Sequence, residues 1–286
     1  MQPQNTSLRK AVRSTEAYAE LLANARHVMA TKHAGKSPTA RGEEKLIMAL
    51  NWVYRWGWSS AKTIDRVGGS KGAGLAARLV RAQYLVATRT ASGLAQRDLP
   101  SHILTLTQDG LSRIQRERDI LLPYSTDPAR VRQDQLRHYQ IAQTATLKAL
   151  QEQRIVAYNV EKELAEVSAD GVKQPDVVWY LPGDTDTSAA VEIELSPKWG
   201  RAMDVFVRGC SVALTPTRTE PARFDFVFII SDSSAIIKRY SAALSAGSTY
   251  ELWKKDASGH ILRIKDSTQR VSAEVAEKVL CRNWND

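Results

Sequence analysis

Over most of the first half of the chain, hydrophobic residues recur at helical intervals. The stretch EEKLIMALNWVYRW (43–56) has apolar residues three and four apart, and Gly57 stands where such a helix would end. The two serines that follow can cap a shorter helix through Arg66, and Ser70 opens a third helix, SKGAGLAARLVRAQYL. Two extended runs around a glycine-containing turn come next, in VATRTASGLAQRDLPSHILTLTQDG, followed by a helix in LSRIQRERDIL.

Helix, short helix, helix and β-hairpin, in this order, are the layout of a winged helix-turn-helix. In the third helix Leu75 and Leu79 share one face. Lys71, Arg78 and Arg81 form a basic stripe along another face, on which Gly74 also lies. Such a stripe suits a recognition helix that faces phosphates and base edges, although the same cations could simply solvate a small helical domain. The predicted DNA contacts are Ser70, Lys71, Arg78 and Arg81 in this helix and Arg89 and Arg97 in the wing.

Four aromatic residues, Trp52, Tyr54, Trp56 and Trp58, lie at and just beyond the end of the first helix. Aromatic side chains can stack on nucleobases. Aromatics at helical spacing near a turn are more typical of a packed core, and we predict that these four residues are core anchors.

In the second half of the chain, hydrophobic residues begin to alternate with polar ones at a period of two, as they do in strands. After the amphipathic helix HYQIAQTATLKALQEQR come three strands, then a helix, a buried strand, another helix, a terminal hairpin around Asp256–Gly259 and a last helix near 272–281. The three strands are IVAYNVEKEL, PDVVWYLP and AAVEIEL. The α-β-β-β-α-β order predicts an α/β (α+β) layered domain. The polar, proline-containing residues 119–136 are the candidate joint, and the predicted regions are a helical leader (1–40), a winged helix (41–125) and the α/β domain (137–286).

The charge differs between the two halves of the chain, whose net charge is +9. Residues 1–150 carry a net +12 and residues 151–286 a net −3. A basic half suggests a polyanionic partner, with nucleic acid first and an acidic protein surface as the alternative. We expect a cytoplasmic protein with no membrane span, because no long apolar run or secretory leader is present, and the two cysteines have no CxxC partner.

Acidic residues mark the three predicted strands of the second half. Glu161 and Glu163 lie two apart on the first strand, Asp176 begins the second, and Glu192 and Glu194 share a face of the third. If the strands are neighbours, Glu161, Asp176 and Glu192 converge at one end of a sheet. Such oxygen ligands suit Mg²⁺ or Mn²⁺. Acids that alternate along a strand can also mark a solvated face, so the metal site is one of two interpretations.

The pattern Pro-Asp, a gap, Glu-x-Glu and a following lysine, in KQPDVVWYL…AAVEIELSPK, resembles the PD-(D/E)xK nuclease superfamily. Together with the winged helix and HYQIAQTATLKAL, residues 43–246 resemble the replication-relaxation family, which includes mobilization relaxases. The resemblance implies a restriction-endonuclease-like domain that nicks double-stranded DNA with Mg²⁺ or Mn²⁺ during plasmid or mobile-element mobilization or replication. The alternative is a non-enzymatic DNA-binding regulator, whose second domain dimerises or docks a partner protein.

The resemblance also assigns roles to individual residues. Asp176 matches the metal carboxylate after the proline, Glu192 matches the acid of the third strand, and Glu161 matches the upstream acid, with Glu163 as its substitute. Glu194 stands where most of the superfamily carries the catalytic lysine. Either Lys198 supplies that charge from a shifted position, or Glu194 acts as a second carboxylate.

Overall fold

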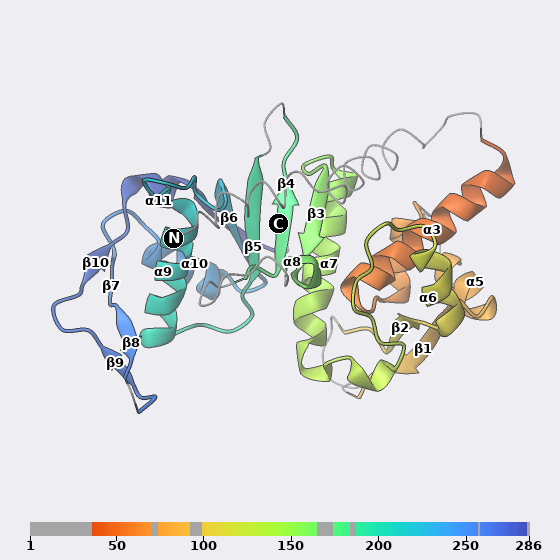
Figure 1. The fold of residues 1–286 in the computed structure, drawn as a ribbon, viewed down its shortest axis with the longest axis horizontal. Coiled ribbons are helices and arrows are strands. Elements are labelled where there is room, and N and C mark those ends of the chain that lie inside the picture. The colour runs from red at the N-terminus through yellow and green to blue at the C-terminus, as the bar shows by residue number, and fades with distance from the viewer. Residues whose placement is uncertain are drawn as a thin grey trace. The chain divides into compact units, whose positions relative to one another are not determined.

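The computed structural model shows a protein of mixed helices and strands, which confirms the predicted mixture (Figure 1). It describes residues 36–69, 74–91, 99–164, 174–183, 187–256 and 258–284. By their contacts these residues form an N-terminal unit (described residues between 36 and 164) and a C-terminal unit (described residues between 174 and 284). Nearly all of the predicted leader, residues 1–35, lies outside the described residues.

The N-terminal unit begins with three helices and a β-hairpin, in the predicted order. These elements and the helix that follows are α3 (Pro38–Trp56), α4 (Ala61–Val67), α5 (Leu75–Arg81), β1 (Leu85–Arg89), β2 (His102–Leu106) and α6 (Gln108–Gln115). Strands β1 and β2 pair antiparallel, with Leu85 opposite Leu106. Helix α5 contacts α4 and β1, and α3 contacts β2 and α6.

Capping decides where the first two helices begin and end. Helix α3 starts earlier than predicted because Ser37 caps it, with Oγ accepting from the Ala40 amide at 3.2 Å, and Pro38 occupies its first turn. It ends at Gly57, whose φ of 84° is left-handed, as the sequence predicted. Ser60 caps α4 by accepting from the Thr63 amide at 3.2 Å.

The aromatic cluster lies in the core, as predicted. Trp52, Tyr54, Trp56 and Trp58 are each at most 5% exposed. Trp52 and Trp56 have ring centroids 5.8 Å apart. None of these four rings is therefore open to a nucleobase.

The two units part later in the chain than the predicted joint. Helix α7 (Leu136–Gln151) is tied to the N-terminal unit by the buried Gln143 side chain, which accepts from Trp52 Nε1 at 3.0 Å and from Ser59 Oγ at 2.7 Å. Tyr124, within the predicted joint, donates from its hydroxyl to the Gly57 carbonyl at 3.1 Å. The polar composition of residues 119–136 therefore reflects a chain that packs along this unit, with two short turns, η1 (Pro128–Arg130) and η2 (Gln133–Gln135).

The first of the three acidic strands is shorter than predicted. Strand β3 (Ala157–Val160) ends where helix α8 (Glu161–Leu164) begins. Glu163 explains the change, because its Oε2 accepts from the Val160 amide at 3.0 Å and so caps the new helix. The predicted shared strand face of Glu161 and Glu163 is therefore wrong.

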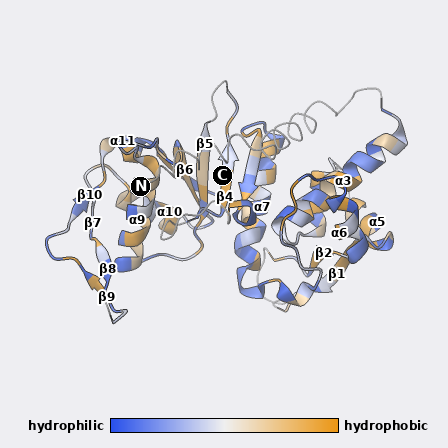
Figure 2. Cartoon of the chain, viewed as in Figure 1, coloured by the Kyte–Doolittle hydropathy of each residue, from blue (hydrophilic) through white to orange (hydrophobic). Residues whose placement is uncertain are grey.

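In the C-terminal unit four neighbouring strands follow the order β11, β6, β5, β4. Their bounds and those of the helices beside them are β4 (Val177–Tyr180), β5 (Ser188–Ile193), α9 (Arg201–Leu214), β6 (Phe226–Ser231), α10 (Ser234–Ala243) and β11 (Val279–Asn283). Strand β5 is antiparallel to β4 and parallel to β6, and β11 is parallel to β6. Strand β6 is hydrophobic along most of its length (Figure 2), as expected of a buried central strand.

The end of the chain contains the predicted hairpin and two strands, β10 (Gln269–Arg270) and β11, that the sequence did not predict. Strands β8 (Trp253–Lys255) and β9 (Ile261–Arg263) form the hairpin, and β7 (Thr249–Tyr250) pairs with β10. The last helix, α11 (Ala273–Glu277), is short, and the chain then enters β11. Among the described residues, no helix combines the length and the hydropathy that a membrane span requires.

Candidate nucleic-acid interface and carboxylate site

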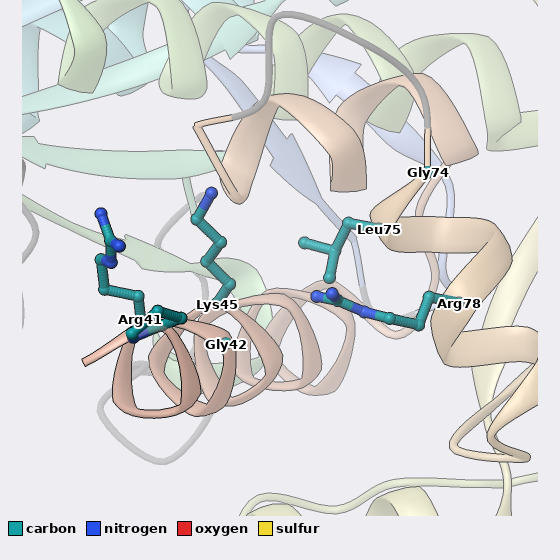
Figure 3. Close-up of a pocket in the computed structure, with 7 residues that line it drawn as sticks. Arg41, Gly42, Lys45, Gly74, Leu75 and Arg78 are labelled. Atoms are coloured by element: carbon teal, nitrogen blue, oxygen red, sulfur yellow. The ribbon is translucent and has the colours of Figure 1, made fainter.

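A basic pocket lies between helices α3 and α5 of the N-terminal unit. Arg41 and Lys45 enter it from α3, and Arg78 extends toward them from α5 (Figure 3). The pocket has a volume of about 470 Å³. Its remaining lining residues are Pro38, Gly42, Gly74 and Leu75. No carboxylate lines the pocket, so three positive charges face a space large enough for a phosphate group and its neighbours.

The lining of this pocket contains basic side chains and no acidic side chain. Within the described residues, none of the three cations forms an ion pair with a carboxylate. Asp65, on the neighbouring helix α4, instead accepts from the backbone amides of Gly74 at 3.3 Å and Ala76 at 2.9 Å. Asp65 therefore fixes the start of α5, and the positive potential of the pocket comes from its side chains.

The predicted DNA-binding residues divide into three groups. Arg78 lies in the pocket. Arg81, at the end of α5, and Arg89, at the end of β1, are exposed but do not line it. Ser70, Lys71 and Arg97 lie outside the described residues.

Sequence reasoning missed Arg41 and Lys45. Their spacing of four residues on α3 was the available signal, since such residues share a helix face. It was missed because the predicted helix begins at Glu43 and so leaves Arg41 outside it.

Two of the predicted metal ligands lie at one corner of the C-terminal unit. Asp176 directly precedes β4, and its Oδ2 accepts from the Ile193 amide at 2.7 Å while its own amide donates to the Val191 carbonyl at 3.1 Å. These two bonds hold Asp176 against the residues on either side of Glu192. Glu192 is only 6% exposed and lies opposite Ile229 of β6. The structure therefore brings Asp176 and the Glu192 segment together.

Lys198, the candidate for the lysine role, and Glu194, the candidate second carboxylate, belong to one cluster. Lys198 Nζ contacts both carboxylate oxygens of Glu194, and the Tyr240 hydroxyl donates to Glu194 Oε2 at 2.8 Å. Glu194 is 5% exposed, and the Lys198 ammonium also lies 4.9 Å from the centroid of the Phe206 ring. Burial and the bond to Glu194 raise the pKa of the Tyr240 hydroxyl well above its ordinary range. The positive charge of Lys198 is thus balanced within the cluster.

Tyr240 was missed because no sequence signal links it to Glu194. It lies on α10, far along the chain from β5, and only the packing of the helix brings the two side chains together.

The predicted upstream acid belongs to the other unit. Glu161 is exposed at the start of α8, and its Oε2 accepts from the Tyr139 hydroxyl at 2.8 Å. Glu163 forms a buried ion pair with Arg55, with Nε and Oε1 2.7 Å apart. A structural ion pair therefore accounts for Glu163, the substitute for Glu161.

Among the described parts of the chain, no group of three His, Cys, Asp or Glu side chains is placed to hold a metal ion. The comparisons add no relatives, since no family model, curated protein or solved structure matches the chain.

Proposed function

We propose that this protein binds duplex DNA through its N-terminal unit. The observation that supports the proposal best is the basic pocket, which Arg41, Lys45 and Arg78 line from two helices without a carboxylate among the lining residues. Phosphate groups supply most of the affinity in DNA binding, and lysine and arginine are their usual partners. In this proposal α3 to α5 and the β1–β2 hairpin act as a winged helix, with α5 as the recognition helix.

Binding is tested by measuring the affinity for a fluorescent DNA duplex over a range of salt concentrations. Arg78→Ala should weaken binding and reduce the slope of log K against log salt by about 0.9, the value for one lost phosphate contact. The matched control is Arg116→Ala, which removes an exposed arginine outside the pocket at the end of α6. Equal slopes for wild type and Arg78→Ala would contradict the role of the pocket.

A second candidate function, metal-dependent cleavage of a phosphodiester, is favoured by the position of Asp176. Mg²⁺ typically takes one or two protein carboxylates and completes its shell with water and phosphate oxygens. Asp176 and Glu192 provide two carboxylates at one corner, so the oxygen donors fit this ion. A bound Mg²⁺ or Mn²⁺ would supply positive charge at a scissile phosphate.

The chain's own residues would prepare this site in two ways. The Ile193 amide orients the Asp176 carboxylate. Glu194, which is balanced by Lys198 and held by Tyr240, would fix the end of β5 next to Glu192. We therefore assign Glu194 and Lys198 a positioning role. By the family resemblance, the biological setting would be plasmid or mobile-element mobilization or replication.

Cleavage and metal binding are tested with one variant, Asp176→Asn, which keeps an oxygen that can accept from Ile193 but removes the charge. Wild type should nick supercoiled plasmid with Mg²⁺ or Mn²⁺ and should bind Mn²⁺ in calorimetry, and the variant should lose both properties. Duplex binding should be unchanged. A wild-type protein that binds duplex but neither binds Mn²⁺ nor nicks plasmid would be a non-enzymatic DNA-binding regulator.

A further inference from the structure

An exposed tryptophan stands beside the buried cluster of Glu194, Lys198 and Tyr240. Trp199 is 65% exposed, whereas the large aromatic residues of the N-terminal cluster are almost completely buried. It follows Lys198 directly in the segment between β5 and α9. An exposed indole offers a large aromatic surface with a polar edge, a combination that is enriched where proteins contact ligands and partners.

The Trp199 side chain is held by an arginine. The Arg239 guanidinium lies over the indole, with Cζ 3.4 Å from the ring centroid, and Arg239 Nε donates to the Lys198 carbonyl at 2.7 Å. Arg239 and Tyr240 are consecutive on α10, so the same helical turn binds Glu194 through Tyr240 and Trp199 through Arg239. This double attachment fixes the indole before any ligand arrives, which reduces the entropy lost on binding.

Besides Arg239, which lies over the indole, two more cations are close to this segment in the sequence. Lys238 and Arg201 are exposed and adjoin Arg239 and the Trp199 segment in sequence. Neither these two residues nor Arg239 forms an ion pair with a carboxylate within the described residues. These cations stand out because residues 151–286 carry a net charge of −3. The local chemistry favours a ligand that is both flat and anionic.

We propose that Trp199 and Arg239 form a stacking platform for an unpaired nucleobase of single-stranded DNA. A nucleobase provides a flat π surface for the indole, and its phosphates complement Arg239 and the neighbouring cations. In an intact duplex both faces of a base are occupied by its neighbours, so the platform selects single strands. The inference rests on the proposed function, because it specifies the form of DNA that the C-terminal unit takes.

The test compares the full-length protein with Trp199→Ala and Trp199→Phe, using fluorescence anisotropy with an oligothymidylate and with a DNA duplex. Loss of one base stack should weaken oligothymidylate binding by Trp199→Ala about tenfold. Trp199→Phe should retain most of the affinity, and Val212→Ala, which trims another exposed apolar side chain, should bind like wild type. Duplex affinity should be unchanged in all three variants.

An oligonucleotide with abasic positions separates stacking from charge. Wild type should bind this ligand about as weakly as Trp199→Ala binds the normal oligonucleotide, and Trp199→Ala should not distinguish the two ligands. Equal oligothymidylate affinity in wild type and Trp199→Ala overturns the platform. The same conclusion follows if Trp199→Ala changes only the oligomeric state, which would make Trp199 a contact between copies of the chain.

The inference and the proposed function can fail separately. If Arg78→Ala weakens duplex binding while Trp199→Ala leaves oligothymidylate binding intact, only the platform is wrong. If wild type binds neither form of DNA, both proposals are wrong.

Discussion

Two sites, the basic pocket and the cluster of Glu194, Lys198 and Tyr240, treat similar charged residues in opposite ways. In the basic pocket of the N-terminal unit, Arg41, Lys45 and Arg78 line a cavity of about 470 Å³ that has no acidic residue in its lining. At the end of β5 in the C-terminal unit, Lys198 is paired with the buried Glu194, and Tyr240 bonds to the same carboxylate. The first arrangement leaves its charge available to a polyanion. In the second arrangement the charge is paired inside the protein and is not available to a ligand.

The difference teaches what each group of charges can do. Exposed, uncompensated cations contribute little to folding but attract phosphates over distances limited by salt screening. A buried ion pair contributes little to the affinity for a distant anion, but loss of one partner leaves an uncompensated charge inside the protein. The basic pocket therefore leaves its charge available to an anionic ligand, which the proposed DNA binding requires, and the cluster around Glu194 holds a segment of backbone in place.

The largest expected effect comes from removing all three pocket cations. The variant Arg41→Ala/Lys45→Ala/Arg78→Ala should bind a DNA duplex roughly 10²- to 10³-fold more weakly at about 0.1 M salt, with a salt slope lower by about 2.7. The reason is the loss of three phosphate contacts. Anisotropy titrations at several salt concentrations measure both quantities. A loss of affinity smaller than threefold would mean that the charge of the basic pocket is not used to bind DNA.

The next effect is on stability and belongs to the other unit. Glu194→Ala should lower the free energy of unfolding by about 2 kcal/mol, because it leaves Lys198 and the Tyr240 hydroxyl without their shared acceptor. The value is below that of a fully buried pair, since the Lys198 side chain is 31% exposed. Urea unfolding followed by circular dichroism provides the measurement.

The matched change in the pocket is Arg78→Ala, which should shift the unfolding free energy by less than about 0.5 kcal/mol. If Arg78→Ala and Glu194→Ala destabilise the protein equally, the pocket cations are structural, and the distinction between the two regions disappears.

Local signals in the sequence predicted the helices well and the units less well. The serine cap of α4, the glycine at the end of α3 and the apolar spacing of Leu75 and Leu79 act within a few residues, so they can be found by inspection. The boundary between the units depends on the buried Gln143, whose partners lie far away in sequence. A polar run such as 119–136 has the composition of a linker whether or not it packs.

The same limit applies to the candidate sites. The predicted convergence of Asp176 and Glu192 required their strands to be neighbours, and β4, which Asp176 directly precedes, does pair with β5. The pattern could not show that Glu163 is bound to Arg55 or that Glu194 is bound to Tyr240, because both contacts join distant parts of the chain. Likewise β11 pairs parallel to β6. Nothing in the five residues of β11 indicates which strand they pair with, because the partner is far away in the sequence.

A smaller effect tests the tyrosine of the cluster. Tyr240→Phe removes the hydroxyl that donates to Glu194 at 2.8 Å and should lower the free energy of unfolding by about 1.5 kcal/mol, as for other hydrogen bonds to a charged group. Tyr84→Phe is the control, because the Tyr84 hydroxyl makes no hydrogen bond within the described residues. Thermal or urea unfolding of both variants measures the difference, and equal stabilities would mean that Lys198 alone holds Glu194.

The smallest effect distinguishes the pocket from the rest of the basic stripe. Arg78 and Arg81 are both exposed on α5, but only Arg78 lines the pocket. If the pocket holds a phosphate, Arg81→Ala should change duplex affinity by less than about threefold and the salt slope by less than 0.9, the value expected for a full phosphate contact. Titrations of both single variants under identical salt conditions measure this. A loss for Arg81→Ala that equals the loss for Arg78→Ala would mean that the whole face of α5 contacts DNA and that the pocket adds nothing to it.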